Sequence, residues 1–285
     1  MRHITNIKII ATISLLLLAS SFAAVVKASH AWGKYHWNKS TDDTKVNPLK
    51  LGDNLDTPNW DSALSVASTD WNDSVLKNEV APGTSNANCD PTSGKVELCN
   101  GEYGNNGWLG IASIWATRGR SNHIVQGVVK VNDTYFNTTK YNSQAWRDLV
   151  ICQEVGHTFG LDHQDEDFYN ANLGTCMDYT SDPDGTALDQ LDNRHPNKHD
   201  YDMMTEIYAH LNSTDDGDGS GNGNGKGNGN GGGKGKPSGV GQNINLNDPS
   251  EWGQAIKQDA QGKDSLFERT LPNGQVLITH IIWVD

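Results

Sequence analysis

The segment 152–163, which reads CQEVGHTFGLDH, is the feature that most constrains what this chain can fold into. Glu154 and His157 are three positions apart, so they project from the same face of a helix. Gly160 then permits a left-handed backbone conformation that ends the helix and turns the chain. Because His163 follows that turn, the pattern predicts that two imidazoles and one carboxylate converge at the end of a helix.

These groups together predict a metal site. Neutral imidazole is a good zinc ligand, and a carboxylate that lies beside the metal without binding it can take a proton from water. Gln153 lies four positions before His157, so its amide points toward the same place. An amide oxygen is a neutral and weak donor, which suits harder cations better than zinc.

The segment resembles the metzincin signature H-E-x-x-H-x-x-G-x-x-H. Glu154, His157, Gly160 and His163 match it, whereas Gln153 stands where the first histidine belongs. The resemblance implies a zinc-dependent endopeptidase in which His157 and His163 hold one zinc ion. It also implies that Glu154 is the general base that activates water.

A second resemblance lies downstream, where residues 175–179 read TCMDY and are similar to the metzincin methionine turn. This similarity implies that Met177 lies beneath the metal. Tyr179 resembles the tyrosine that astacins and serralysins bring to the metal, which implies a role in stabilising the oxyanion. Residues 67–71, 109–112 and 202–208 resemble matrixins, and residues 177–179 are similar to pappalysins. The resemblance covers roughly residues 47–211.

The third metal ligand stays open between three possibilities. The oxygen of Gln153 is a weak ligand that Tyr179 supplements, or another histidine supplies the third nitrogen, or the site binds little metal and the protein is a non-catalytic relative. The histidines considered for this role are His36, His123, His195 and His199. A secreted binding or adhesion protein is therefore the alternative to an enzyme.

The expected fold is α+β, because the resemblance implies a twisted mixed sheet with an antiparallel edge strand, an active-site helix, the methionine turn and a final helix. Apolar spacing predicts helices that begin near Pro58, span residues 143–159 and span residues 200–211. Strands are predicted at residues 47–52, 96–99, 108–115 and 124–131. The strand 108–115 resembles the edge strand along which metzincin substrates pair, so it is the expected peptide-binding strand.

Composition divides the chain into four parts. Residues 1–28 carry Arg2 and Lys8 before an apolar run, which is typical of a secretory signal peptide, although an uncleaved membrane anchor is the alternative. Residues 29–212 hold the metallopeptidase-like domain, and residues 213–243 read as a Gly/Asn-rich linker. Residues 244–285 are expected to form a small separate module, in which Asn273-Gly274 predicts a β-hairpin.

The charge of the chain limits the partners that it is expected to bind. A formal charge of −13 disfavours nucleic acid as a partner, so a protein or peptide substrate is expected, with the chain acting as a secreted monomer away from membranes. Asp162, Asp165, Glu166 and Asp167 form either a calcium site or a solvated acidic loop.

Secretion favours disulfides between the four cysteines. Cys89 and Cys99 are favoured as one pair because they close a short loop, which leaves Cys152 and Cys176 either as the second pair or as two buried thiols. The resemblance implies that Cys152 and Cys176 meet, because the methionine turn of metzincins runs beneath the metal-binding helix.

Overall fold

The computed structural model describes residues 30–31, 35–38, 48–119, 122–209 and 244–285. The expected signal peptide (residues 1–28) and the expected linker (residues 213–243) lie outside these residues. The described helices are α1 (Pro58–Trp71), α2 (Asp133–Phe136), α3 (Gln144–Thr158) and α4 (Lys198–Ile207), and a 3-10 helix spans Pro249–Glu251. No described helix is long and apolar enough to span a bilayer.

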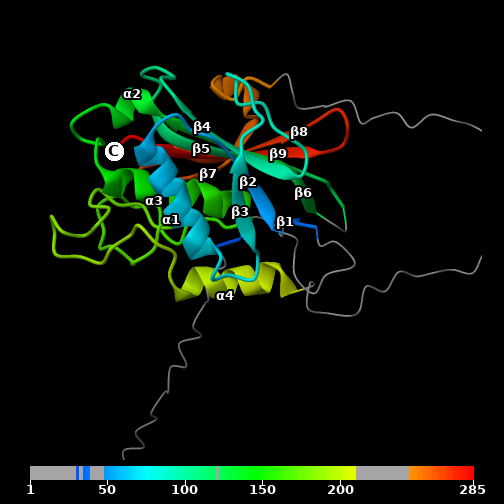
Figure 1. The fold of residues 1–285 in the computed structure, drawn as a ribbon. Helices are drawn as coiled ribbons and strands as arrows, with labels where there is room; N and C mark the ends of the chain where they lie inside the picture. The colour runs from blue at the N-terminus through cyan, green and yellow to red at the C-terminus, as the bar shows by residue number, and fades with distance from the viewer. Residues whose placement is uncertain (1–29, 32–34, 39–47, 120–121, 210–243) are drawn as a thin grey trace, which may run out of the picture.

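The strands form one mixed sheet, which confirms the α+β class (Figure 1). Their order is β3-β2-β4-β6-β5-β9-β8-β7, and β1 pairs with β6. The strands β1 to β4 and β6 are parallel where they pair with one another, whereas β5 and the last three strands pair antiparallel. Their bounds are β1 His36–Trp37, β2 Leu49–Asn54, β3 Asn78–Pro82, β4 Lys95–Gly101, β5 Trp108–Ala116, β6 His123–Asn132, β7 Gln254–Gln258, β8 Asp264–Thr270 and β9 Val276–Trp283.

The expectation that the strand 108–115 lies at an edge of the sheet is wrong. This strand, β5, is antiparallel to β6 as expected, but β9 pairs along its other side. The hairpin predicted in the tail is present as β8 and β9, but it continues the main sheet instead of forming a module of its own. An isolated hairpin is marginally stable, and an edge strand exposes unpaired backbone groups. Pairing β9 with β5 stabilises the hairpin and covers the side of β5 that β6 leaves free.

Helices α1 and α3 lie side by side against the sheet, as Figure 1 shows. The predicted helix 143–159 begins at the N-cap Ser143, whose side chain accepts a hydrogen bond from the backbone N–H of Trp146. Trp71 and Val155 belong to the buried apolar cluster that joins these helices to the sheet. Because α3 also contacts β5, β6 and β9, its buried face is held directly over the junction between the main domain and the tail.

Two disulfides join Cys89 to Cys99 and Cys152 to Cys176. These are the two pairs that the sequence favoured. The second one links α3 to the loop before Met177, because Cys152 lies in the helix next to Gln153 and Cys176 precedes the methionine. It therefore ties the loop before Met177 to the helix that carries Gln153 and His157.

Candidate metal centre

The last turns of α3 carry Glu154 and His157, and Gly160 ends the helix with a φ of 101°. A Cβ at Gly160 would collide with the backbone oxygen of Tyr35, so glycine is required both for the left-handed conformation and for space. The turn brings the chain back so that His163 faces His157. The predicted convergence of these two imidazoles is therefore present in the structure.

His157 and His163 are oriented by oxygen acceptors on their outer nitrogens. The Nδ1 of His157 donates to the backbone oxygen of Leu161 at 2.8 Å, and the Nδ1 of His163 donates to Oε1 of Glu166 at 2.7 Å. The two Nε2 atoms then face each other at 2.9 Å, with ring planes 89° apart. Carboxylates and carbonyls that hold the outer nitrogen are the usual partners of metal-binding histidines, because they leave Nε2 for the ion.

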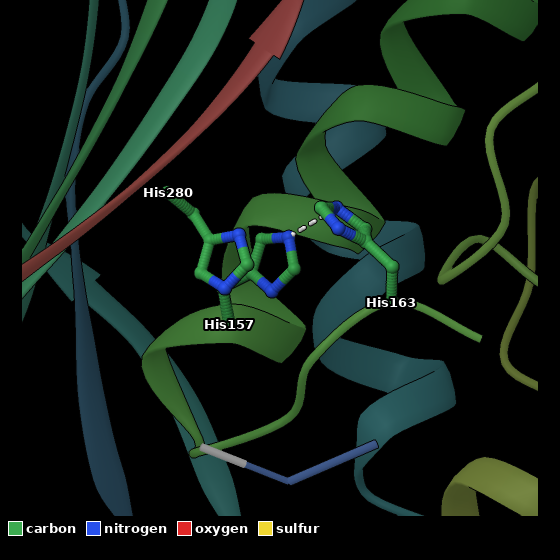
Figure 2. A group of neighbouring side chains, drawn as sticks. All are labelled: His157, His163 and His280. Atoms are coloured by element: carbon green, nitrogen blue, oxygen red, sulfur yellow. Dashed lines mark hydrogen bonds between the residues drawn. The ribbon is translucent and has the colours of Figure 1, made fainter. Parts of the chain in front are cut away.

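A third imidazole, that of His280 in β9, joins this pair, as Figure 2 shows. Its ring stacks on that of His157, with centroids 3.8 Å apart and planes inclined by 7°. One ligand nitrogen from each of the three rings can be chosen so that all lie within 4.8 Å of one another. Because the His157 and His280 rings are parallel, one ion cannot lie in both ring planes, so coordination by all three rings requires one of them to turn.

Sequence reasoning missed His280. The only signal was a single imidazole in the inward positions of a strand whose neighbours are apolar, since residues 276, 278 and 282 share its face. The histidines that were considered instead lie elsewhere. His36 contacts His123, the Nδ1 of His195 lies 2.6 Å from Oδ2 of Asp70, and His199 stacks on His30.

Gln153 and Glu154 are among the buried polar groups that protein contacts leave unsatisfied in the described part of the chain. Neither amide atom of Gln153 and neither carboxylate oxygen of Glu154 has a hydrogen-bond partner among the described residues. Burial raises the pKa of Glu154 well above its usual value. Gly110 of β5 makes room for this carboxylate, since a Cβ there would lie 2.5 Å from Oε1 of Glu154. Unsatisfied groups of this kind are costly unless a ligand, ion or water meets them.

Burial also favours the neutral form of two of the imidazoles, those of His157 and His280. It lowers the pKa of His157 and of His280 well below the usual range, and the neighbouring histidines lower both further. Neutral imidazole is the form that binds a metal. Three imidazoles beside an unsatisfied carboxylate suit a zinc ion, so the donor set fits the metal that the sequence predicted.

Two of the acidic residues around His163 form ion pairs with a lysine. Lys257 of β7 lies 2.9 Å from Oδ2 of Asp162 and 2.7 Å from Oε1 of Glu166. Burial opposes ionisation of Glu166, but the charges and hydrogen bonds of His163 and Lys257 outweigh it and hold the pKa of Glu166 at about 2. Asp165 accepts the backbone N–H of Asp167 instead of facing this group. The four acids that the sequence offered for calcium are thus divided between an ion pair and a turn.

Met177 packs against α3, and Tyr179 contacts His163. The sulfur of Met177 packs on α3 at Gly156, where an added Cβ would lie 2.7 Å from it. The ring of Tyr179 meets that of His163 edge to face, with centroids 4.5 Å apart. Its hydroxyl donates a 3.0 Å hydrogen bond to the backbone oxygen of Ile281 in β9, so the predicted oxyanion-stabilising group is engaged by the tail.

The whole site is closed to solvent. Gln153, Glu154, His157, His163 and His280 are between 0% and 5% exposed. A peptide cannot reach Glu154 in this arrangement, because β9 lies along β5 where such a peptide would pair. The side chains therefore offer donors that suit a metal ion, whereas their accessibility is that of a protein core.

Comparisons with known proteins find structural likeness only. No protein-family model matches the chain, and no curated protein matches it. High choriolytic enzyme 1, a hatching enzyme zinc-protease from the medaka fish Oryzias latipes, is similar with a TM-score of 0.32 and 11% identity, over 62% of this chain and 94% of that one. Two structures of myroilysin are similar with TM-scores of 0.33 and 0.32 and identities of 11% and 12%, each over 65% of this chain and 96% of theirs. Likeness at this level assigns no family, so function has to be inferred from the site itself.

Proposed function

We propose that this chain is a secreted, zinc-dependent endopeptidase that hydrolyses peptide bonds of extracellular proteins. The observation that carries the proposal is the buried carboxylate of Glu154, which has no hydrogen-bond partner among the described residues and lies one helical turn before His157. A protein core tolerates such a carboxylate poorly. A general base beside a metal needs this combination of burial, raised pKa and unused acceptor oxygens.

His157 and His163 are the two ligands on which the proposal depends, and Gln153 and His280 are the candidates for completing the set. When bound, zinc supplies Lewis-acid chemistry, because it polarises a peptide carbonyl and lowers the pKa of water. Glu166 holds the Nδ1 proton of His163 and so keeps its Nε2 directed at the ion position.

Proton transfer falls to Glu154. Its raised pKa allows one oxygen to accept the proton of the attacking water and then to release it to the leaving amine nitrogen. The ring of Tyr179 contacts that of His163, and burial raises the pKa of its hydroxyl well above the usual value, so the hydroxyl stays a neutral donor. We assign it to the developing oxyanion, once its hydrogen bond to Ile281 is broken.

The experiment compares the purified protein with Glu154→Gln, His157→Ala and His163→Ala, and measures bound zinc and the cleavage of casein during prolonged incubation. We expect near-stoichiometric zinc in the parent and in Glu154→Gln, loss of cleavage in Glu154→Gln, and loss of zinc in both histidine variants. Glu102→Gln, at an exposed position, is the matched control and should change neither. A parent protein without zinc would contradict the proposal.

A second candidate is a secreted binding protein that keeps the metal site for structure alone. The observation that favours it is the complete burial of the site, because structural zinc sites are closed whereas catalytic ones keep an open position. Bound zinc without cleavage by the parent or by any variant that opens the site would favour this candidate over the enzyme.

A further inference from the structure

Strand β9 lies along β5 as an extended antiparallel peptide. Its register pairs Ala116 with Val276 at one end and Trp108 with Trp283 at the other, with a single irregularity between Trp108 and Gly110. His280 is opposite Ala112, two positions from Gly110, whose missing side chain leaves space for Glu154. β9 therefore runs beside the part of β5 that faces the predicted base.

The inward side of β9 enters the metal centre itself. His280 stacks on His157, and the backbone oxygen of Ile281 accepts the hydrogen bond from the hydroxyl of Tyr179. A peptide paired with β5 in the same orientation would place one side chain and one carbonyl at these positions. The tail thus contacts the predicted metal ligand and the predicted oxyanion donor through the same kinds of groups as a bound peptide.

Other parts of the tail hold the loop that carries His163. Lys257 forms ion pairs with Asp162 and Glu166, and the hydroxyl of Ser265 donates to Oε2 of Glu166 at 3.0 Å. The backbone N–H of Ala260 also donates to the backbone oxygen of Glu166 at 3.2 Å. The tail therefore contacts the site from two sides, through β5 and through the loop that carries His163.

The outward side of β9 is anchored by apolar contacts that do not touch the site. Trp252 and Ile281 form one buried cluster with Trp108 and Ile111 of β5. Ser113 of β5 and Thr279 of β9 are opposite each other, with their hydroxyl oxygens 2.9 Å apart. Since successive residues of a strand point to opposite faces, these anchors can be changed without altering His280.

We propose that residues 244–285 are an internal occupant of the peptide-binding strand, so that the folded chain is latent and admits an extended peptide substrate only when β9 leaves β5. His280 departs with β9, which opens the ion position and frees the hydroxyl of Tyr179 together. This inference rests on the proposed function for its substrate, but the docking of the tail and the closure of the metal site are properties that can be measured without catalysis.

Sheet-edge pairing explains why one strand excludes the other. An extended peptide binds to a sheet by adding a strand at a free edge, and β5 has a single side that is not taken by β6. β9 fills that side over its whole length. A substrate that paired instead with β7, the edge of the described sheet on this side, would be separated from β5 by two strands.

The test locks and loosens this contact in the full-length chain. The double variant Ser113→Cys/Thr279→Cys introduces a disulfide across the opposed pair, which holds β9 on β5 when oxidised. Trp252→Ala removes a buried anchor of the tail and should favour the undocked form. Trp60→Ala is the matched control, because Trp60 is equally buried but packs on Phe136 in the main domain.

Two readouts are measured for each protein: the rate at which a chelator removes bound zinc, and the rate of cleavage of an extended fluorogenic peptide. We expect Trp252→Ala to raise both rates by about tenfold or more, since each ~1.4 kcal/mol of lost docking free energy changes the open population tenfold. The oxidised crosslinked protein should release zinc at least about tenfold more slowly than its reduced form, on the same scale. The parent, treated with the same reductant, corrects for the native disulfides.

The outcomes separate the inference from the function on which it rests. Equal zinc-release rates for the oxidised and reduced crosslinked protein, or equal effects of Trp252→Ala and Trp60→Ala, would overturn the latency. Zinc release that follows the crosslink without any peptide cleavage would uphold the closure by β9 and count against the endopeptidase. A parent protein that never binds zinc would remove the proposed function and this inference with it.

Discussion

His280 stacks on His157 with ring centroids 3.8 Å apart, which ties the last strand of the sheet to the helix that carries the predicted base. The contact is buried and forms the junction between two parts of the chain that the sequence assigned to different domains. His157 and His163 face each other through Nε2, whereas His280 lies parallel to His157. We therefore treat the first two as the permanent ligands and His280 as the displaceable one.

Replacing Gln153 by histidine should strengthen zinc binding. The amide of Gln153 is buried without a hydrogen-bond partner among the described residues, and an imidazole is a better zinc donor than an amide. We expect the dissociation constant of zinc in Gln153→His to fall about tenfold or more, equivalent to ~1.4 kcal/mol, in a competition titration with a chelator. Gln153→Leu is the control without a donor, and equal affinities in the two variants would show that residue 153 does not face the ion.

Adding one methyl group at Gly110 should impair cleavage while leaving zinc in place. A Cβ there would lie 2.5 Å from Oε1 of Glu154 and 2.9 Å from Cγ1 of Val150, so the carboxylate has to move. We expect Gly110→Ala to keep its zinc, to lose most peptide cleavage, and to lose about 1–3 kcal/mol of unfolding free energy through overpacking. Gly127→Ala, in β6, is the control away from Glu154. Unchanged cleavage in Gly110→Ala would argue against Glu154 as the base.

Removing the disulfide between Cys152 and Cys176 should affect zinc as well as stability. The bridge spans 24 positions, so its loss should lower the unfolding free energy by about 3 kcal/mol in the chain-entropy account. Because Cys152 adjoins Gln153 and Cys176 adjoins Met177, we also expect weaker zinc binding in Cys152→Ala/Cys176→Ala. The double variant Cys89→Ala/Cys99→Ala should lose similar stability without changing zinc affinity, as measured by denaturant unfolding and chelator titration.

Lys130 should make the stability of the protein depend on pH in the alkaline range. Burial lowers the pKa of its ammonium group to about 8, although it donates to Asn247 and lies 4.1 Å from the ring of Tyr103. Between this pKa and the unfolded value of about 10.4 the unfolded chain binds more protons, so the unfolding free energy rises with pH.

The variant Lys130→Met isolates this contribution. We expect its unfolding free energy to exceed that of the parent near neutral pH by on the order of 2 kcal/mol, with the difference shrinking as the pH rises from 8 to 10.5. Lys50→Met, at an exposed position of β2, is the control and should follow the parent. Parallel curves for the parent and Lys130→Met would show that the lysine is not desolvated as the structure indicates.

Local spacing determined the predicted site. Glu154 and His157 share a face because they are three positions apart in a helix, and Gly160 returns the chain so that His163 meets His157. Four strands of the main sheet (β2, β4, β5 and β6), the helices α1, α3 and α4, and the hairpin of the tail were likewise predicted from apolar periodicity and turn residues, whereas β1, β3 and β7 were not. These features depend on interactions within a few residues, so their physical cause is present in the sequence itself.

Only the tertiary structure decided where the tail goes and which histidine joins the site. Any apolar strand can pair with any free sheet edge through the same backbone hydrogen bonds, so no local pattern shows that β9 pairs with β5. The pairing register then places His280 opposite Ala112 and over His157, a position that its own neighbours do not reveal. The sequence by itself thus determined the chemistry at the end of α3, and long-range strand pairing decided that this chemistry is enclosed.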